Sequence, residues 1–384
     1  MSSTGHACAL ALGGAVVIGL AVAVGGTAGG DTSQTTSLRR LPRSPNIGDT
    51  CRKHDGETAL VIPLRADENG IFLVDIGVED EEGVTQWIKA AVDTGSEALL
   101  VAGEGCAGCE EGKHLGTVKQ DGEEIRRSTI RYGSQQDTVV WRKKQIHIPA
   151  WLHTCDPSDT DGAHTDTVQC IVGDCPCAIV ESRTGTSDYN ILGLGSQNPR
   201  GPPAVLSTLF PKTPRAFEIH VHSDEEARLI IHRPHGEGCR EPRYRFSVRD
   251  KSLGHAHHYL VTGSKPTLYQ AGPIGGTNTA HVVNNNNYDV LFDTGSNAIS
   301  LPPEIYDQVQ KMSYNKGVLE MSFKTVDQTD TMVLRIDYNR RDRFNAQVLK
   351  SHSAMMIIGI TFLKGHSIGY EDDGTQRIMT FDYI

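Results

Sequence analysis

The sequence predicts a mostly β protein built from two similar lobes, and three observations support this prediction. Short runs of β-branched and aromatic residues recur along most of the chain, separated by Gly, Asp, Glu and Asn, as is typical of strands and hairpins. Helical periods are few, and the best are PPAVLSTLF (202–210) and PPEIYDQVQKM (302–312), each opened by proline as helix starts often are. One strand-like segment also occurs twice, because AVDTGSEALL at 91–100 returns as VLFDTGSNAI at 290–299.

Length and composition fit this organisation. A chain of 384 residues is too long for one ordinary core, and about 150 residues per domain suggests two or three units. Hydrophobic residues make up 38% and charged residues 22% of the chain, with 40 Gly and 17 Pro, which is usual for a globular protein rich in strands and turns. The formal net charge is −10, so no basic surface points to nucleic acid or anionic lipid as a partner.

The N-terminal segment predicts entry into the secretory pathway. Residues 7–30 carry no charged side chain and end in small residues, so we expect residues 1–30 to be a signal peptide, with a retained signal anchor as the alternative. Residues 31–57 are polar and basic and contain proline, which suggests a leader or propeptide. We expect the protein outside the cell or in an acidic lumenal or vacuolar compartment, with membrane contact only if the anchor is retained.

The repeated segment divides the rest of the chain into two lobes. We expect an N-terminal β lobe over 58–238 and a C-terminal β lobe over 239–384, joined within HRPHGEGCREPRY, where Pro, Gly and charge cluster. Each lobe later carries aliphatic residues followed by glycine, NILGL at 190–194 and MIIGI at 356–360. Two self-similar lobes are a simpler explanation of these matches than two unrelated domains.

The cysteines favour disulfides over metal binding. Eight of the nine cysteines follow the signal segment, an even number that suits an oxidising compartment: Cys51, Cys106, Cys109, Cys155, Cys170, Cys175, Cys177 and Cys239. Zinc is the rival explanation for the C-x-x-C pair at 106 and 109, but a structural zinc site needs a second pair at suitable spacing. Eight cysteines permit 105 pairings, and the sequence does not choose among them.

The chain resembles the pepsin-like aspartic proteases over about residues 58–384. The resemblance is carried by two Asp-Thr-Gly-Ser motifs, each preceded by an apolar strand and followed by an aliphatic-aliphatic-Gly motif. It implies a bilobal β fold in which Asp93 and Asp293 meet, share a proton and activate a water. The residues expected to support these carboxylates are Thr94, Gly95, Ser96, Thr294, Gly295 and Ser296.

The resemblance also implies a flap and a short disulfide loop. IRYGS at 130–134 is similar to the family's flap, in which Tyr132 would close over the substrate while Gly133 and Ser134 bond its backbone. Cys106 and Cys109 stand where many relatives carry a disulfide loop. The chain departs from the family pattern at Leu100, where a tryptophan is usual, and at Glu97, where a small polar residue is commoner.

These features predict a monomeric aspartic endopeptidase that acts on polypeptides at acidic pH and needs no metal or cofactor. The alternative is a catalytically inactive relative that binds or inhibits another protein. Such relatives usually lose an Asp or Gly of a motif, and both motifs are intact here. Proteases that carry one motif per chain and dimerise are disfavoured because this chain carries two.

Overall fold

The computed structural model describes about two thirds of the chain, and both copies of the repeated motif lie in the described part. The described residues are 52–53, 59–109, 115–132, 135–153, 164–185, 189–196, 203–210, 216–223, 226–232, 242–249, 258–270, 279–312, 316–339, 348–351, 354–372 and 376–383. The predicted signal segment and most of the predicted leader lie outside them, as do Gly133 and Ser134.

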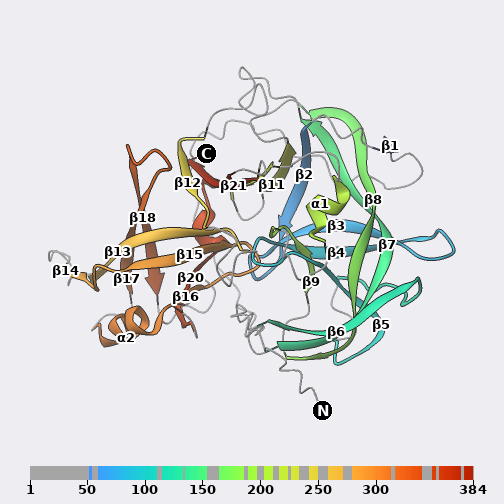
Figure 1. The fold of residues 1–384 in the computed structure, drawn as a ribbon, viewed down its shortest axis with the longest axis horizontal. Coiled ribbons are helices and arrows are strands. Elements are labelled where there is room, and N and C mark those ends of the chain that lie inside the picture. The colour runs from blue at the N-terminus through green and yellow to red at the C-terminus, as the bar shows by residue number, and fades with distance from the viewer. Residues whose placement is uncertain are drawn as a thin grey trace, which may run out of the picture.

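The described strands form two sheets, so the prediction of a mostly β protein is confirmed (Figure 1). The larger sheet has 14 strands. They are β1 (Arg52–Lys53), β2 (Ala59–Ala66), β3 (Phe72–Glu79), β4 (Thr85–Asp93), β5 (Leu99–Ala107), β6 (Glu124–Tyr132), β7 (Gln135–His153), β8 (His164–Thr184), β9 (Asn190–Gly193), β10 (Ala216–Val221), β11 (Ala227–His232), β12 (Tyr244–Ser247), β21 (His366–Asp372) and β22 (Arg377–Tyr383).

The smaller sheet has eight strands. They are β13 (Leu260–Gln270), β14 (Thr279–Val282), β15 (Asn287–Asp293), β16 (Ile299–Leu301), β17 (Lys316–Lys324), β18 (Thr331–Asn339), β19 (Val348–Lys350) and β20 (Met356–Gly359). The helical segments are α1 (Val205–Leu209), α2 (Pro303–Lys311) and η1 (Ile360–Leu363). The first two lie in the segments expected to be helical, and α2 has Pro303 in its first turn, as the sequence suggested. No helix among the described residues is long and apolar enough to cross a membrane.

The sequence repeat is also a repeat of strand pairing. β4 ends at Asp93 and pairs in parallel with β9, so that Asp93 stands beside Gly193. β15 ends at Asp293 and pairs in parallel with β20, which places Asp293 beside Gly359. β9 and β20 then pair antiparallel with the strand that follows each motif, β5 and β16. The aliphatic-aliphatic-Gly motifs are therefore the strands that hold the two Asp-bearing strands in place.

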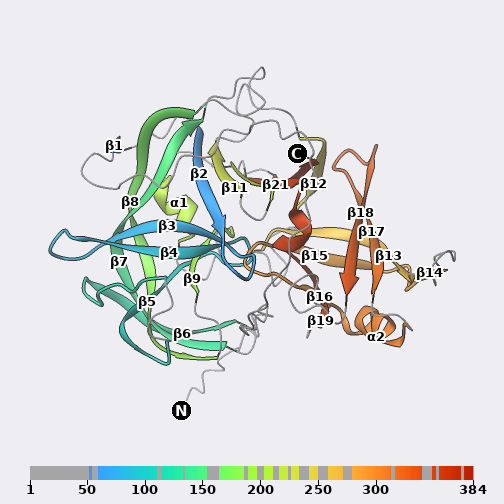
Figure 2. The same ribbon diagram turned by 180° about the vertical axis from the view of Figure 1, so that it is seen from behind.

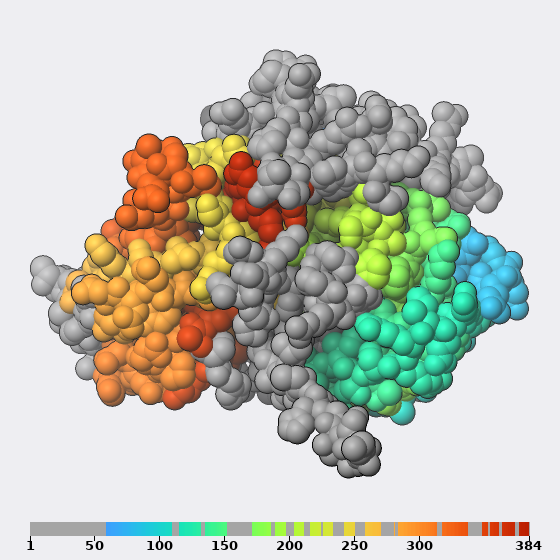
Figure 3. All heavy atoms as spheres, viewed as in Figure 1, coloured from blue at the N-terminus to red at the C-terminus, as the bar shows by residue number. Residues whose placement is uncertain are grey.

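The two halves of the chain occupy opposite ends of the molecule and share one layer. Figures 1 and 2 show β13 to β18 on one side and β2 to β9 on the other, and Figure 3 shows the same separation in atoms. β21, β22 and β12 belong to the larger sheet although they follow residue 239, because β10 pairs with β21 from Phe217↔Tyr370 to Val221↔His366. The sheets therefore do not divide at the predicted lobe boundary.

An aromatic cluster packs this shared layer against the strand that leads to the second motif. Tyr370 stacks on Tyr259 with ring centroids 4.1 Å apart and contacts Phe217 at 5.2 Å. Phe292 lies next to Asp293 in the chain and packs near Phe381 of β22 at 6.2 Å. All five rings are less than a tenth exposed, and burying one large apolar side chain contributes about 1.5–3 kcal/mol. This packing holds β15 in place and thereby sets the position of Asp293 at its end.

Candidate active site

The structure brings Asp93 and Asp293 together although 200 positions separate them. Each carboxylate accepts a hydrogen bond from the glycine two residues later, from Gly95 N at 2.7 Å and from Gly295 N at 3.0 Å. A Cβ atom on Gly95 would lie 2.9 Å from Asp293 Oδ1, and one on Gly295 would lie 2.6 Å from Asp93 Oδ1. Each loop therefore crosses the opposite carboxylate so closely that only glycine fits.

The two threonines lock the loops to each other through four reciprocal hydrogen bonds. Thr94 N donates to Thr294 Oγ1, and Thr294 N donates to Thr94 Oγ1, both at 3.1 Å. Thr94 Oγ1 donates in turn to Phe292 O at 2.6 Å, and Thr294 Oγ1 donates to Val92 O at 2.7 Å. Both threonines are fully buried, so these groups depend on one another to satisfy their polar atoms.

The two serines break this symmetry. Ser96 Oγ donates to Asp93 Oδ2 at 2.7 Å. Ser296 Oγ faces Ala298 instead, donating to its carbonyl at 3.5 Å and accepting from its N–H at 3.3 Å. The expectation that Ser296 supports the second carboxylate therefore fails in this structure. Asp93 has both carboxylate oxygens hydrogen-bonded to its own loop, whereas Asp293 has one.

The surroundings of Asp293 oppose its ionisation. Burial raises the pKa of Asp293 well above its usual range, and the negative charge of Asp93 and its hydrogen-bond contact raise it further. The N–H of Gly295 opposes these effects without outweighing them. Two carboxyl groups buried this close together titrate as a unit and can hold one proton between them.

A hydroxyl group that sequence reasoning did not identify lies beneath the second loop. Tyr370 OH donates to Phe292 O at 3.3 Å, the same carbonyl that accepts from Thr94 Oγ1. Burial raises the pKa of Tyr370 well above its usual range, so it remains a neutral donor. Nothing in the local sequence marks Tyr370, because its contact depends on how β21 packs under β15.

The predicted flap segment forms a β hairpin of β6 and the first part of β7. β6 pairs with β7 from Glu124↔Arg142 to Tyr132↔Gln135, so only Gly133 and Ser134, which lie outside the described residues, separate the two strands. We call residues 124–142 the β6–β7 hairpin. It packs on the segment that follows the first motif, through a small core listed here: Ala98, Leu100, Val139, Trp141, Ala178 and Val180, with Ile130 at its edge.

A tryptophan from the hairpin fills the space beside Leu100. Leu100 is fully buried, and Trp141 of β7 is 3% exposed in the same small core. Trp141 Nε1 donates to Ser128 Oγ of β6 at 2.8 Å, and the Arg126 guanidinium lies 4.9 Å from the centre of the Trp141 ring. The chain therefore carries an indole near the first motif, contributed by a different strand from the one in which the family pattern has it.

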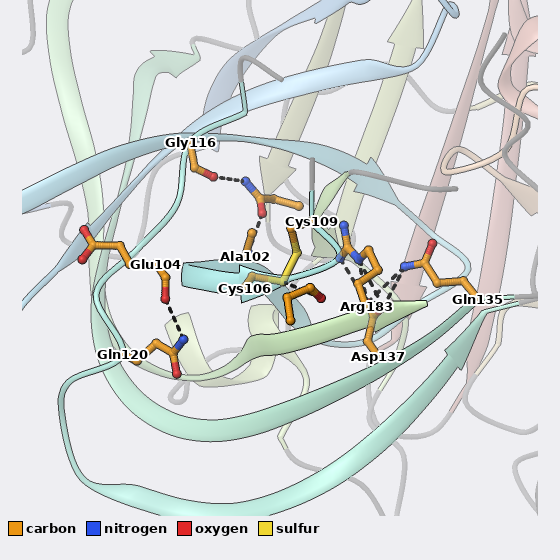
Figure 4. Close-up of a disulfide and its surroundings, with 11 residues drawn as sticks. Ala102, Glu104, Cys106, Cys109, Gly116, Gln120, Gln135, Asp137 and Arg183 are labelled. Atoms are coloured by element: carbon orange, nitrogen blue, oxygen red, sulfur yellow. Dashed lines mark hydrogen bonds and ion pairs between the residues drawn. A yellow bond between two sulfur atoms is a disulfide. The ribbon is translucent and has the colours of Figure 1, made fainter. Parts of the chain in front are cut away.

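The described cysteines include one disulfide pair and one pair of free thiols. Cys106 and Cys109 are joined by a disulfide (Figure 4). Cys175 and Cys177 are buried free thiols, contrary to the expectation that the lumenal cysteines pair. A hydrogen bond with Cys175 raises the pKa of Cys177 well above its usual range, and burial adds to this effect. Among the described residues, no cluster of His, Cys, Asp or Glu is arranged to hold a metal ion.

Comparison of the chain with models of known protein families gives no match, and comparison with curated proteins gives none either.

Proposed function

We propose that the protein is an aspartic endopeptidase of pepsin-like fold. The observation that supports this proposal most strongly is the pair of buried carboxylates, Asp93 and Asp293, held by interlocked loops of identical Asp-Thr-Gly-Ser sequence. Two close carboxyl groups titrate as a unit and hold a single proton near neutral and acidic pH. Such a pair supplies a base and an acid at the same point.

The proposed reaction is general acid–base hydrolysis of a peptide bond. Asp93, in its ionised form, takes a proton from a water molecule as the water oxygen attacks the peptide carbonyl carbon. Asp293, in its protonated form, donates a hydrogen bond to the carbonyl oxygen, where negative charge develops. Asp93 then gives the proton that it took from the water to the peptide nitrogen, the C–N bond breaks, and the pair returns to its starting state with Asp93 ionised and Asp293 protonated. The step needs no covalent intermediate with the enzyme.

The β6–β7 hairpin is the proposed flap over the polypeptide. Tyr132 ends β6, and the residues that follow it would bond the substrate backbone as an added strand. The contact of the hairpin with Ala98 and Leu100 supports this role, because it ties the hairpin to the first catalytic loop. Closure of such a hairpin excludes water from the reacting groups.

We further propose a secreted or lumenal monomer made as an inactive precursor. The apolar segment 7–30 and the basic leader 31–57 support this. An inactive, protein-binding relative is the second candidate. It is disfavoured by the intact hydrogen bonds to both carboxylates, which a pure binding protein has no reason to retain.

The test is cleavage of a denatured protein substrate by the purified full chain at pH 3 to 7, with and without pepstatin. We expect internal peptide bonds to be cut at acidic pH, and we expect pepstatin to block the cleavage. Intact substrate at every pH, both before and after removal of the leader, would favour the inactive relative.

A further inference from the structure

The β6–β7 hairpin is supported along most of its length by a third strand. Residues 136–140 of β7 pair with β6 on one edge and with β8 on the other. The pairing with β8 extends to Gln136↔Thr184, one residue short of the Tyr132↔Gln135 pair that closes the hairpin. The hairpin is therefore continuous with the larger sheet through β8 and is not a free two-stranded arm, which is marginally stable at best in isolation.

A buried charged network joins β7 to β8 near the end of the hairpin (Figure 4). Asp137 of β7 is fully buried and stands directly opposite Arg183 of β8, which is 4% exposed. Arg183 Nη2 donates to Asp137 Oδ2 at 3.0 Å and Arg183 Nε donates to Asp137 Oδ1 at 3.1 Å. Gln135 Nε2 donates to the same carboxylate at 3.0 and 3.1 Å. Gln135 is 6% exposed and pairs with Tyr132.

This network restricts the arrangement of its side chains more than it stabilises the fold. Moving a carboxylate and a guanidinium out of water costs about as much as their attraction returns, so an apolar pair is often as stable. A two-pronged Arg–carboxylate contact does, however, allow one arrangement only. The network is outside the dyad, and the proposed reaction makes no use of its charges. Its distinctive property is its position, at and next to the Tyr132↔Gln135 pair that closes the hairpin.

We propose that Arg183, Asp137 and Gln135 are positioning residues that hold the last strand pair of the β6–β7 hairpin, Tyr132↔Gln135, in register. This inference rests on the proposed function, in which the hairpin is the flap. Arg183 fixes Asp137 from β8, Asp137 fixes the Gln135 amide, and Gln135 fixes the strand pair that carries Tyr132. The substrate would then meet a hairpin whose paired strands are ordered in advance.

Hydrogen–deuterium exchange of the full chain, followed by mass spectrometry, tests the proposal without any need for activity. Gln135→Ala removes the amide and leaves the Asp137–Arg183 pair intact. The control is Gln145→Ala on the same strand, which removes another amide–carboxylate bond, from Gln145 Nε2 to Glu79 Oε2 at 3.0 Å, outside the hairpin. Because Arg183→Ala would strand a buried carboxylate and could fail to fold, the second variant is the double replacement Asp137→Leu with Arg183→Met.

We expect amides of residues 124–142 to exchange at least about tenfold faster in Gln135→Ala and in the double variant, with the rest of the chain unchanged. Gln145→Ala should leave hairpin exchange at the wild-type rate. For a peptide that the wild type cleaves, Gln135→Ala should raise KM more than it lowers kcat. Unchanged hairpin exchange in Gln135→Ala overturns the proposal, and so does a uniform rise across the whole chain, which marks a merely structural role. A wild-type chain that cleaves no peptide refutes the proposed function instead, and the exchange rates still decide whether the network positions the hairpin.

Discussion

At the scale of single residues, two identical tetrapeptides acquire different hydrogen bonds. Asp93-Thr94-Gly95-Ser96 and its repeat at 293–296 have the same sequence, and their threonines and glycines make equivalent hydrogen bonds in both loops. The serines do not, because Ser96 bonds a carboxylate and Ser296 bonds Ala298. The sequence could predict that the motifs meet. It could not predict this difference, since a hydroxyl rotates toward whichever acceptor the surrounding loop offers.

The serine asymmetry predicts unequal effects of two matched substitutions. Ser96→Ala removes a hydrogen bond to an ionised acceptor, which is worth about 1.5–3 kcal/mol, and should lower kcat/KM by roughly 10- to 100-fold. Ser296→Ala touches no carboxylate and should stay within about threefold of wild type. The measurement is kcat/KM from pH 2 to 7 on one peptide; equal losses in the two variants would contradict the assignment of Asp93 as the base.

At the scale of elements, the sequence predicts where helices and strands occur better than it predicts which elements they contact. The helical segment at 302–312 and the strands that end at Asp93 and Asp293 follow from proline position and apolar runs, which are local signals. The role of Trp141 depends on the register of β7 with β6, which has a bulge between the Glu124 and Arg126 pairs. A shift of one residue would turn the indole to the other face. No local pattern specifies such a register.

The β6–β7 hairpin should therefore depend on Trp141 for its stability. Trp141→Ala empties a buried indole site and should lower the free energy of unfolding by about 3–5 kcal/mol. Trp141→Phe keeps an aromatic ring but loses the bond to Ser128, and should cost about 1 kcal/mol. Trp87→Ala is the control, since Trp87 of β4 is 37% exposed and its loss should cost less than about 1 kcal/mol. Urea unfolding measures all three; a Trp141→Ala variant as stable as Trp87→Ala would show that the small core does not hold the hairpin.

At the scale of the whole molecule, a shared layer joins what the sequence divides into two lobes. The repeat predicts two similar halves, but β21, β22 and β12 are added to the larger sheet by long-range pairing. The polar side of this layer carries Glu218 of β10, whose carboxylate accepts from His220 Nε2 at 2.8 Å and His232 Nε2 at 3.0 Å. Sequence analysis did not identify this cluster, because the histidines that reach Glu218 depend on the register between β10 and β11.

This cluster should make the stability of the shared layer depend on pH. Burial of Glu218 acts to raise the pKa of its carboxyl group, but the hydrogen bonds and charges of the two histidines outweigh burial and lower the pKa well below its usual range. A depressed folded pKa contributes stability above the unfolded value, near 4.5, and this stability is lost as pH falls through the folded value. The contribution also depends on the charge of the histidines, and histidine is the side-chain type whose charge ordinarily changes between pH 5 and 8.

Glu218→Gln should therefore lower the free energy of unfolding by about 1 kcal/mol at pH 5.5 and by less at pH 8.5. The control is Glu320→Gln, whose partner Arg335 lies at 2.7 Å and stays charged at both pH values. Its effect on urea unfolding should be the same at pH 5.5 and pH 8.5. A Glu218→Gln cost that does not change between these pH values would exclude the histidines as its cause.

The central claim is that two carboxyl groups from the two halves act as one catalytic unit. The most direct measurement is the rate of peptide hydrolysis at one acidic pH by purified Asp93→Asn and Asp293→Asn, with Asp289→Asn, four residues earlier on β15, as the matched control. Each dyad variant keeps the shape of the side chain but removes either the shared proton or its acceptor. We expect both to lose at least about a thousandfold in kcat/KM with unchanged folding by circular dichroism, and we expect the control to stay within about threefold of wild type. A folded Asp93→Asn or Asp293→Asn variant within tenfold of wild type would contradict the claim.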